Sequence, residues 1–309
     1  MTEMMDPTVE APVAPGLPEK SDGKAMSKWT LYTRRFMRNK PAVGGIVIFL
    51  LLVLFAIFAP LIAEYDHIEL DFLNLGTPPS LEHWFGTTPS GNDTFAQVAI
   101  GLQRSLMIAV TVSVGTTIIS ALVGTAAAYF GGWTEKITLT VIHFMMVIPS
   151  FLILSLLSNR SGGDWRVIAL IMIFVVGWYF PARVIWTTAL SLREREYIHA
   201  ARYMGVRGMT IVVRHLLPNI GSLLVINFTL GIVGAVMAET GLSFIGFGVK
   251  IPDVSLGSLI GSGANTITSA PWLFYFPAAA LTLLTVSMAL VADGLRDALD
   301  PTSAAGGRA

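Results

Sequence analysis

The sequence has no cysteine, few charges and few histidines, and each shortage excludes a kind of chemistry. Without cysteine, the 309 residues form no disulfide and offer no thiolate nucleophile or metal ligand. The five histidines form no HxxxH pair, which argues against a structural zinc site. Charged residues make up 13% of the chain, against about a quarter in soluble domains, and hydrophobic residues make up 53%. This balance indicates an integral membrane protein.

Motifs of several functional classes are also missing. There is no GxxxxGK[ST] segment, so the chain cannot cradle ATP phosphates in a P-loop of its own. The formal net charge is zero and there is no strongly basic block, so nucleic acid is not an expected partner. The lack of HExxH and serine-protease motifs counts against an intramembrane enzyme. No apolar run carries regularly spaced arginines and no TVGYG filter is present, which counts against a channel.

Six apolar runs are long enough to cross a bilayer. A hydrocarbon core of about 30 Å requires roughly 20 apolar residues in a helix. The third run contains Pro149 and the fourth contains Pro181, and both prolines are predicted to kink their helices. We therefore expect an all-α, polytopic membrane protein with six transmembrane helices. The runs are residues 42–63, 105–130, 137–157, 167–190, 219–244 and 273–291.

The basic residues are distributed unevenly between the segments that flank these runs. The first 40 residues carry seven lysines and arginines, residues 64–103 carry none, and residues 191–218 carry five. The positive-inside rule then places both termini and the 191–218 loop in the cytosol, with residues 64–103 outside. Residues 29–39 alternate aromatic and basic side chains. They form either a helix along the inner membrane interface or an ordinary positive flank.

We expect four parts along the chain. Residues 1–28 are rich in Pro, Glu, Ala, Ser and Lys and are predicted to be a disordered cytosolic tail. Residues 29–100 hold the interfacial segment, the first span and an external segment. Residues 101–296 form a five-helix core with a cytosolic loop, and residues 297–309 form a cytosolic C-terminal tail.

The loop between the fourth and fifth runs is predicted to be helical and not a flexible tether. Ser191 and Glu194 match the capping box that starts a helix. Residues 197–204 are mostly good helix formers, and Gly205 is a natural left-handed stop. A second break is expected at Gly208. The loop is therefore predicted to be two short helices joined at a glycine corner.

Small side chains distinguish the first of these helices. Ala200 and Ala201 are predicted to form one small surface flanked by Tyr197 and Met204. Such a surface can approach a partner protein closely, while the larger neighbours supply buried area. The alternative is that the helix packs beneath its own membrane bundle.

The residues of this loop resemble a known motif. "EYIHAARYMGVRGMTIVVRHLLPN" resembles the EAA loop of bacterial ABC-importer permeases, whose pattern is Glu-Ala-Ala, three residues, Gly, and later Leu-Pro. His199 stands at the motif's glutamate position and departs from the pattern. The matching residues are Ala200, Ala201, Gly205, Leu217 and Pro218.

The resemblance extends over most of the chain. "FGTTPSGNDTFAQVAIGLQRSL", "AAYFGGW", "LSLREREYIHAAR", "RHLLPN", "ETGLSFIGFGV", "SAPWLFYFP" and "VADGLRDALDP" occur in the order and spacing of the C-type permease subunit of dipeptide and oligopeptide (peptide/nickel) importers. The external "TTPSGNDTF" departs from that family's usual "GRD" turn. Membership would imply the type I ABC-importer permease fold and a location in the bacterial inner membrane.

The resemblance also implies partners and a role. The chain would pair with a homologous second permease subunit as a heterodimer, above two ABC ATPase domains that bind ATP and Mg. An extracytoplasmic substrate-binding lipoprotein would deliver the cargo: dipeptides, oligopeptides, glutathione or nickel complexes. This chain itself would be no enzyme and would hold no cofactor. The alternative function is a stand-alone secondary transporter or channel.

The resemblance assigns the helix at 194–208 to coupling with the ATPases. Closure of the ATPase pair would then bias the membrane subunits between inward- and outward-facing states. The residues expected to contribute are Glu196, Tyr197, His199, Ala200, Ala201, Arg202, Met204, Gly205, Leu217 and Pro218.

Three polar residues of the fifth run are candidates for the translocation pathway. An acid in lipid is expensive, so Glu239 should face the protein interior or a cavity. It is either a gating or substrate-contacting group, or a hydrogen-bonded structural acid. Asn227 and Thr229 either line the pathway or bond between helices.

Overall fold

The computed structural model describes residues 28–299, and helices account for its architecture. The predicted N-terminal tail, apart from Lys28, and residues 300–309 lie outside the described residues. Within 28–299 the only β pairing is a single bridge between Thr87 and Asp93, so the all-α prediction is confirmed. In chain order the elements are α1 (Lys28–Arg38), α2 (Lys40–Ile62), α3 (Thr94–Phe130), α4 (Gly132–Val147), α5 (Ser150–Arg160), α6 (Trp165–Val175), α7 (Tyr179–Arg193), α8 (Glu196–Tyr203), α9 (Gly208–Ile211), the π-helical turn η1 (Val212–Leu216), α10 (Leu217–Asn219), α11 (Gly221–Phe244), α12 (Leu256–Ala264) and α13 (Trp272–Leu299).

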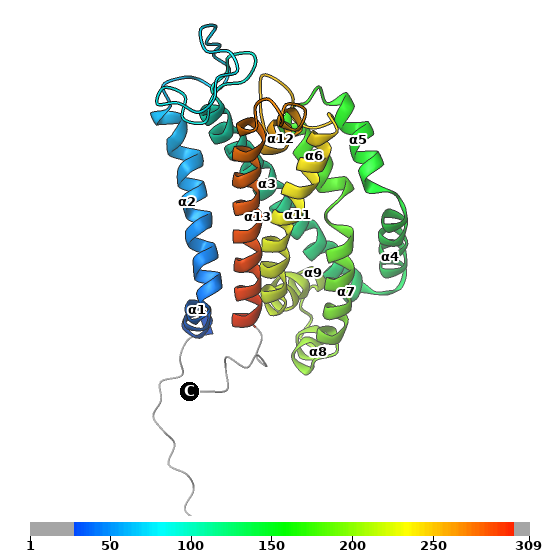
Figure 1. Ribbon diagram of the computed structural model, residues 1–309. Helices are drawn as coiled ribbons and strands as arrows, with labels where there is room; N and C mark the ends of the chain where they lie inside the picture. The colour runs from blue at the N-terminus through cyan, green and yellow to red at the C-terminus, as the bar shows by residue number, and fades with distance from the viewer. Residues whose placement is uncertain (1–27, 300–309) are drawn as a thin grey trace, which may run out of the picture.

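Four long helices form the body of the protein. Helices α2, α3, α11 and α13 are each long and apolar enough to cross a membrane. They run alongside one another, with α7 packed on α3 (Figure 1). Two bent helix pairs, α4 with α5 and α6 with α7, bring the number of spans to six if each pair is one span. This agrees with the six predicted runs.

Both bent pairs have a local cause. Helices α4 and α5 meet at 82°, and Pro149 lies at the break, which confirms the predicted kink. Helices α6 and α7 meet at 41°, but their break comes before Pro181, which occupies the first turn of α7. A proline fits there because the first turn of a helix has unpaired N–H groups anyway. Gly177, at the break, allows close approach, since a Cβ would lie 2.5 Å from the Thr116 Cγ2.

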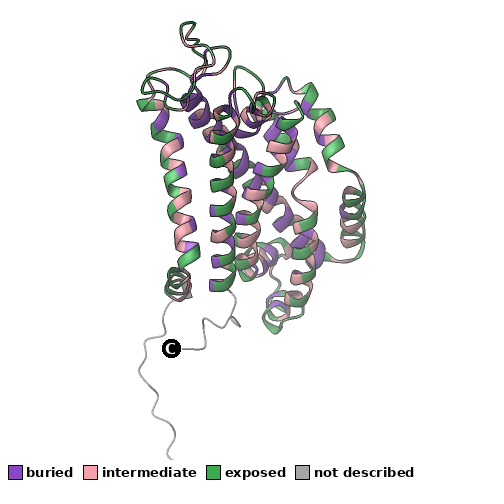
Figure 2. Cartoon of the chain, viewed as in Figure 1, coloured by how far each residue is buried: buried purple, intermediate pink, exposed green. Residues whose placement is uncertain are grey.

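Helix α3 is the centre of the core. Leu102, Ile108 and Val112 on α3 pack in one cluster with Met172 of α6 and Leu284 of α13, among others. The outward faces of the peripheral helices remain exposed and apolar, as the alternating colours of α2 show (Figure 2). Such faces suit contact with lipid tails, which are as apolar as the side chains themselves.

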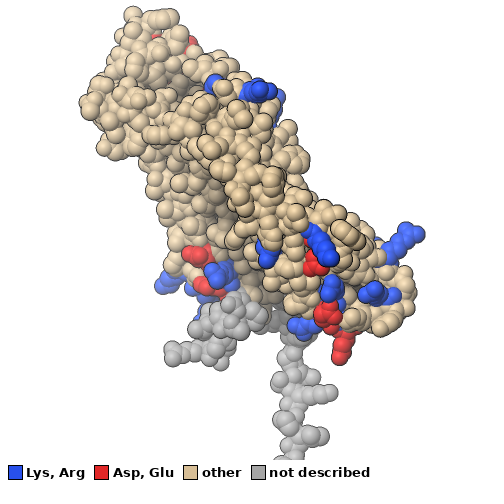
Figure 3. Space-filling model, turned by 90° about the vertical axis from the view of Figure 1, so that its right-hand side faces the viewer, with Lys and Arg blue, Asp and Glu red and all other residues tan. Residues whose placement is uncertain are grey.

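Charged side chains lie mainly toward the two ends of the molecule. In the face shown in Figure 3, an uncharged band separates the upper and lower groups of charges. We call one end the α8 end; it includes α1, α8 and α9. The other is the α12 end, which includes α12 and residues 63–93 (Figure 1).

The N- and C-terminal helices meet at the α8 end. Asn39 caps α2 by accepting a hydrogen bond from the Ala42 N–H (3.1 Å), and its Nδ2 donates to Asp297 (3.2 Å). The predicted tail from residue 297 begins too early, because α13 continues to Leu299. Phe36 of α1 packs against α13, so α1 is a separate helix held on the bundle.

Candidate coupling helix and polar sites

Helix α8 begins later than the capping-box pattern predicts. Ser191 lies inside α7, where its Oγ donates to the Thr188 carbonyl (2.8 Å). Glu194 is the last, capping residue of α7 and accepts a hydrogen bond from Arg193 Nε (2.9 Å). The prediction of a helix start at Ser191 is therefore wrong. Because Ser191 lies inside α7 and not before a helix, its hydroxyl donates to a carbonyl of the preceding turn instead of capping a free amide.

Helix α8 ends as the sequence predicts. Gly205 has a φ of +77°, in the left-handed region. Its N–H bonds to the Arg202 carbonyl, and the Val206 N–H bonds to the Ala201 carbonyl. This pair of bonds is the Schellman motif, which satisfies the last carbonyls of a helix. The predicted glycine corner is confirmed.

The two neighbouring alanines of α8 point to opposite environments. Ala201 is 3% exposed and packs with Ile198 against Ile211, Val212 and Leu216. Ala200, by contrast, is exposed. The prediction that both alanines form one small surface is wrong, because successive residues of a helix are separated by about 100°.

The outer face of α8 exposes large aromatic and apolar side chains beside charged ones. Tyr203 and Met204 are 88% and 76% exposed, and Tyr197 is 43% exposed. Glu196 and Arg202 are exposed beside them, and His199 is half-buried. One face of α8 therefore packs beneath its own bundle, while the other is left uncovered by the described part of the chain.

The second half of the loop anchors α8 to the membrane helices. Turn η1 and α10 follow α9 without a break, and the Leu217 N–H bonds to the Val212 carbonyl. Leu217 is half-buried and packs with Ile185 of α7 and Ile220, while Pro218 is exposed. These two motif residues therefore join the start of α11 to the bundle and do not extend the outer face of α8.

A charged group at the end of α7, just before α8, bonds to α3. Arg193 Nη1 donates to the Ala128 carbonyl (2.8 Å), and its Nε holds Glu194. The Arg193 guanidinium keeps the pKa of the Glu194 carboxyl below its usual value. His199 Nε2 lies 3.6 Å from the same carboxylate. A cavity of about 520 Å³ lies here, between Tyr129 and α8.

Glu239 is fully buried within a hydrogen-bonded group. Its Oε1 accepts hydrogen bonds from Ser243 and Ser255, both at 2.6 Å, while Oε2 has no partner among the described residues. Ser255 caps α12, and the next residue's N–H bonds to Ser105 of α3 (3.1 Å). The carboxylate therefore joins α11 to the start of α12. The two hydrogen bonds to Oε1 are what a structural acid would make, whereas Oε2 stays open to a further contact.

The other two pathway candidates do not join Glu239. Thr229 is buried, and its hydroxyl donates to the Val225 carbonyl of its own helix (2.9 Å). Asn227 is half-buried, and its Nδ2 has no partner within the described chain. The structure brings neither residue into contact with Glu239, and none of the three lines the cavities at either end.

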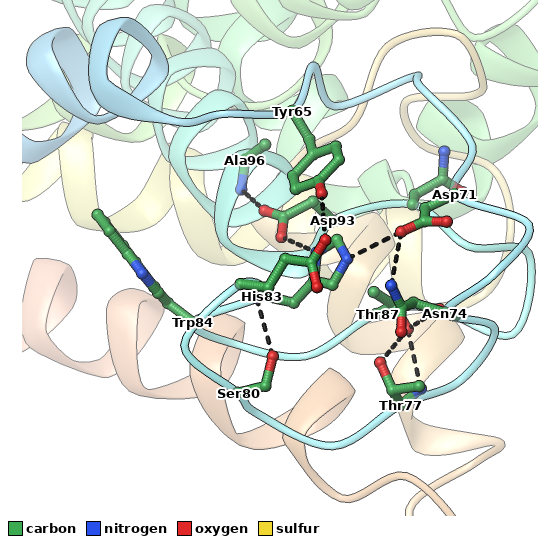
Figure 4. A network of polar contacts seen from close by, with 12 residues as sticks. Tyr65, Asp71, Asn74, Thr77, Ser80, His83, Trp84, Thr87, Asp93 and Ala96 are labelled. Carbon is green, nitrogen blue, oxygen red and sulfur yellow. Dashed lines mark hydrogen bonds and ion pairs between the residues drawn. The ribbon is translucent and has the colours of Figure 1, made fainter.

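Sequence reasoning missed a buried histidine in residues 63–93, at the α12 end. His83 is 1% exposed, with Nδ1 bonded to Asp93 (2.8 Å) and Nε2 to Asp71 (3.3 Å), and its ring stacks on Tyr65 (Figure 4). Burial alone would lower the pKa of His83, but the two aspartates outweigh it and raise that pKa. Asp93 also caps α3 by accepting from the Ala96 N–H. Asp71, His83 and Asp93 follow no sequence spacing that would have predicted their contact.

The same segment holds a second polar pair. Tyr65 donates to Glu82 (2.7 Å), which raises the pKa of Tyr65 to about 12. Asp71, Glu82 and His83 each place one ligand atom within 4.8 Å of the others, close enough for a metal ion. Asp71 and Glu82 are, however, already bonded to His83 and Tyr65 respectively, so these contacts need no ion to explain them.

The fold and the exposed helix together define a class. Long apolar helices with charges toward both ends, and a short helix with one uncovered face, describe a polytopic membrane protein.

Sequence comparisons identify the family. The chain belongs to the binding-protein-dependent transport system inner membrane components, whose family pattern matches residues 118–304. Residues 27–79 match the N-terminal TM domain of oligopeptide transport permease C. The protein is thus a multi-pass inner membrane protein of a binding-protein-dependent transport system.

Several curated relatives cover nearly the whole chain. The oligopeptide transport system permease protein OppC of Mycobacterium tuberculosis (strain H37Rv) is 44% identical over 278 residues, 90% of this chain and 96% of that protein. OppC of Escherichia coli (strain K12) is 34% identical over 285 residues, 92% of this chain and 94% of that protein. The dipeptide transport system permease protein DppC of Alkalihalophilus pseudofirmus is 32% identical over 284 residues, 92% of this chain and 93% of that protein.

Proposed function

We propose that the chain is a permease subunit of an ATP-driven importer of dipeptides or oligopeptides, coupled to partner ATPases through α8. The relatives are named as oligopeptide and dipeptide transport permeases, which supports the cargo class. The observation that carries the coupling role is the outer face of α8, exposed at Tyr203 and Met204 while Ile198 and Ala201 fix the helix from behind.

The partners follow from what the chain has and lacks. It has no P-loop, so ATP and Mg would be bound by two separate ABC ATPase domains at the α8 end. The Lys and Arg distribution supports a cytosolic α8 end, with both termini on that side. A homologous second permease subunit would complete the pathway as a heterodimer. An extracytoplasmic substrate-binding lipoprotein would dock at the α12 end.

The packing of α8 gives it a way to transmit motion. Its inner face is fixed to α9 and η1, which lead through α10 directly into α11. Arg193, the last residue of α7 before α8, bonds to the end of α3. Displacement of α8 by a closing ATPase pair would therefore move two membrane helices together, and the two ATPase states would bias two arrangements of the bundle.

The proposed contact residues divide by position. Glu196, Tyr197, His199, Ala200, Arg202 and Met204 would touch the ATPase, because they lie on the outer or lateral surface of α8. Ala201, Gly205, Leu217 and Pro218 would instead shape and anchor the helix.

The test is a charge on the outer face. Ala200→Asp places a carboxylate where the ATPase groove should close, and the exposed site leaves the membrane fold intact. The assembled importer in proteoliposomes should lose peptide-stimulated ATP hydrolysis and uptake, while Ala200→Ser, the matched small polar control, should retain both.

Two outcomes would overturn the proposal. Wild-type ATP hydrolysis and uptake in Ala200→Asp would remove α8 from the coupling contact. Robust uptake by the isolated chain, without any ATPase, would favour the stand-alone transporter or channel instead.

A further inference from the structure

A large cleft lies at the α12 end, far along the molecule from α8. It has a volume of about 620 Å³ and lies between residues 88–97, the segment 249–254 after α11, and α12. Helix α12, which lines it, lies at the top of Figure 1, beside residues 63–93. This volume falls within the range of about 300–1,000 Å³ that is usual for small-molecule sites.

Part of the lining of the cleft consists of hydrogen-bonding groups of the kind that peptide bonds require. Thr94, Gln97, Ser258 and Ser262 contribute hydroxyl and amide side chains. Thr94 is only 2% exposed, yet its Oγ1 has no hydrogen-bond partner among the described residues. Leaving a buried hydroxyl unpaired is unfavourable, and a ligand amide in the cleft would satisfy it once the Thr94 side chain turns toward the cleft.

The cleft also holds one uncompensated positive charge. Lys250 is exposed and makes no ion pair in the described part of the chain. The carboxylate beside it, Asp253, is already paired with Arg104 Nε at 3.0 Å. Lys250 and Asp253 also line an adjoining cavity of about 300 Å³, to which Arg104, Arg166 and Asp164 contribute, so three cations face two carboxylates there. The surroundings of Lys250 therefore favour a carboxylate.

Apolar side chains also line the cleft. Val254, Leu259, Leu273 and Pro277 line it, and Val254 and Leu273 are buried. A cleft lined by hydroxyl and amide groups, apolar side chains and a lysine matches the parts of a short peptide: its amides, its side chains and its terminal carboxylate.

We propose that this outer cleft binds a short peptide, with Lys250 pairing with the free α-carboxylate and Thr94 bonding to a backbone amide. The inference rests on the proposed peptide import and adds a receiving site on the membrane subunit itself. The site would hold the peptide on the outer side before the pathway opens.

Photolabelling of the full-length chain in lipid nanodiscs tests the site directly. The probe is the tripeptide alanyl-benzoylphenylalanyl-alanine, compared with the same peptide carrying a C-terminal amide. The free acid should label residues lining the cleft, mapped by mass spectrometry. It should do so on the order of tenfold more efficiently than the amide, the effect of one hydrogen bond to a charged group.

Variants separate the site from a general charge effect. Lys250→Gln should reduce labelling by the free acid to the level of the amide and leave labelling by the amide unchanged. Arg160→Gln is the matched control, since Arg160 is exposed at the end of α5 and lines neither cavity. Thr94→Val should keep the protein stable, because the lost hydroxyl has no partner, and should lower labelling by both peptides several-fold.

The result that overturns the inference is equal labelling by acid and amide, or wild-type labelling in Lys250→Gln, or labelling confined to regions outside the cleft. The assay contains no ATPase and no ATP, so a failure of coupling through α8 would leave it unaffected. Conversely, a cleft that is never labelled, while Ala200→Asp still abolishes coupling in the assembled importer, would reject the peptide site alone. That result would leave the proposed function standing.

Discussion

The two ends of the molecule are fastened in different ways. At the α8 end, an eight-residue helix is held by apolar packing on one face and has an uncovered face on the other. At the α12 end, buried polar groups join the elements: Glu239 links α11 to α12, and His83 links the external segment to α3. Apolar contacts do not depend on a particular bond angle, so they suit a helix that is displaced as one body. Hydrogen bonds require specific distances and angles, so they hold the joined elements in one arrangement.

The largest effect should come from charging the packed face of α8. Ala201→Asp would bury a carboxylate without a partner, costing about 3–5 kcal/mol of stability. Thermal unfolding in detergent should show a large loss for this variant. Ala200→Asp, one residue away, should change stability by about 0.5 kcal/mol or less. Similar stabilities for the two variants would contradict the two-faced description of α8.

At the α12 end, loss of the buried acceptor should have the next largest effect. Glu239→Leu leaves the hydroxyls of Ser243 and Ser255 without their acceptor, so a loss of about 2 kcal/mol is expected in the same unfolding assay. Glu239→Gln retains an accepting oxygen and should lose less. If Glu239→Gln folds normally yet abolishes uptake, the carboxylate has a functional role beyond joining α11 to α12.

The glycine corner of α8 should be sensitive to any side chain. Gly205→Ala forces a Cβ into the left-handed region and should cost about 1–2 kcal/mol. Hydrogen exchange of the α8 amides should report the loosened turn. Gly221→Ala is the matched control: the same methyl enters open space on a regular helix and should be neutral or stabilising. Equal hydrogen exchange of the α8 amides in Gly205→Ala and Gly221→Ala would show that the turn at Gly205 accepts a side chain without strain.

The smallest effect should be a pH dependence confined to residues 63–93 at the α12 end. Because the pKa of His83 is raised on folding, its stabilising contribution is full below about pH 6.5, the ordinary value, and is lost as pH rises through the raised pKa. The pKa of Asp71 is lowered, chiefly by the Asn74 amide, so its contribution is present above about pH 3.8 and is lost as pH falls through the lowered pKa.

Hydrogen exchange across residues 63–93 should therefore show the strongest protection between these limits. His83→Gln should abolish the change in protection above pH 6.5, whereas His199→Gln at the α8 end should preserve it. Protection that increases as pH rises past 7 would have the wrong sign for the His83–Asp93 contact.

The sequence by itself determined the features that depend on local physics. Run lengths located the spans because bilayer thickness fixes how many apolar residues are required. Gly205 was predictable because only glycine enters the left-handed region without strain. The kink at Pro149 follows from a missing N–H. The family pattern around Ala200 and Gly205 likewise depends on residues close together in the chain.

Tertiary structure decided which side of each helix is buried and which distant groups meet. Membrane helices are apolar all round, so hydropathy does not mark their packed face, and which of Ala200 and Ala201 is covered depends on where η1 lies. Glu239 meets a serine 16 residues away, and His83 meets aspartates 10 and 12 residues away. No helical or strand periodicity links such positions, because the chain path between them is set by packing of the whole bundle.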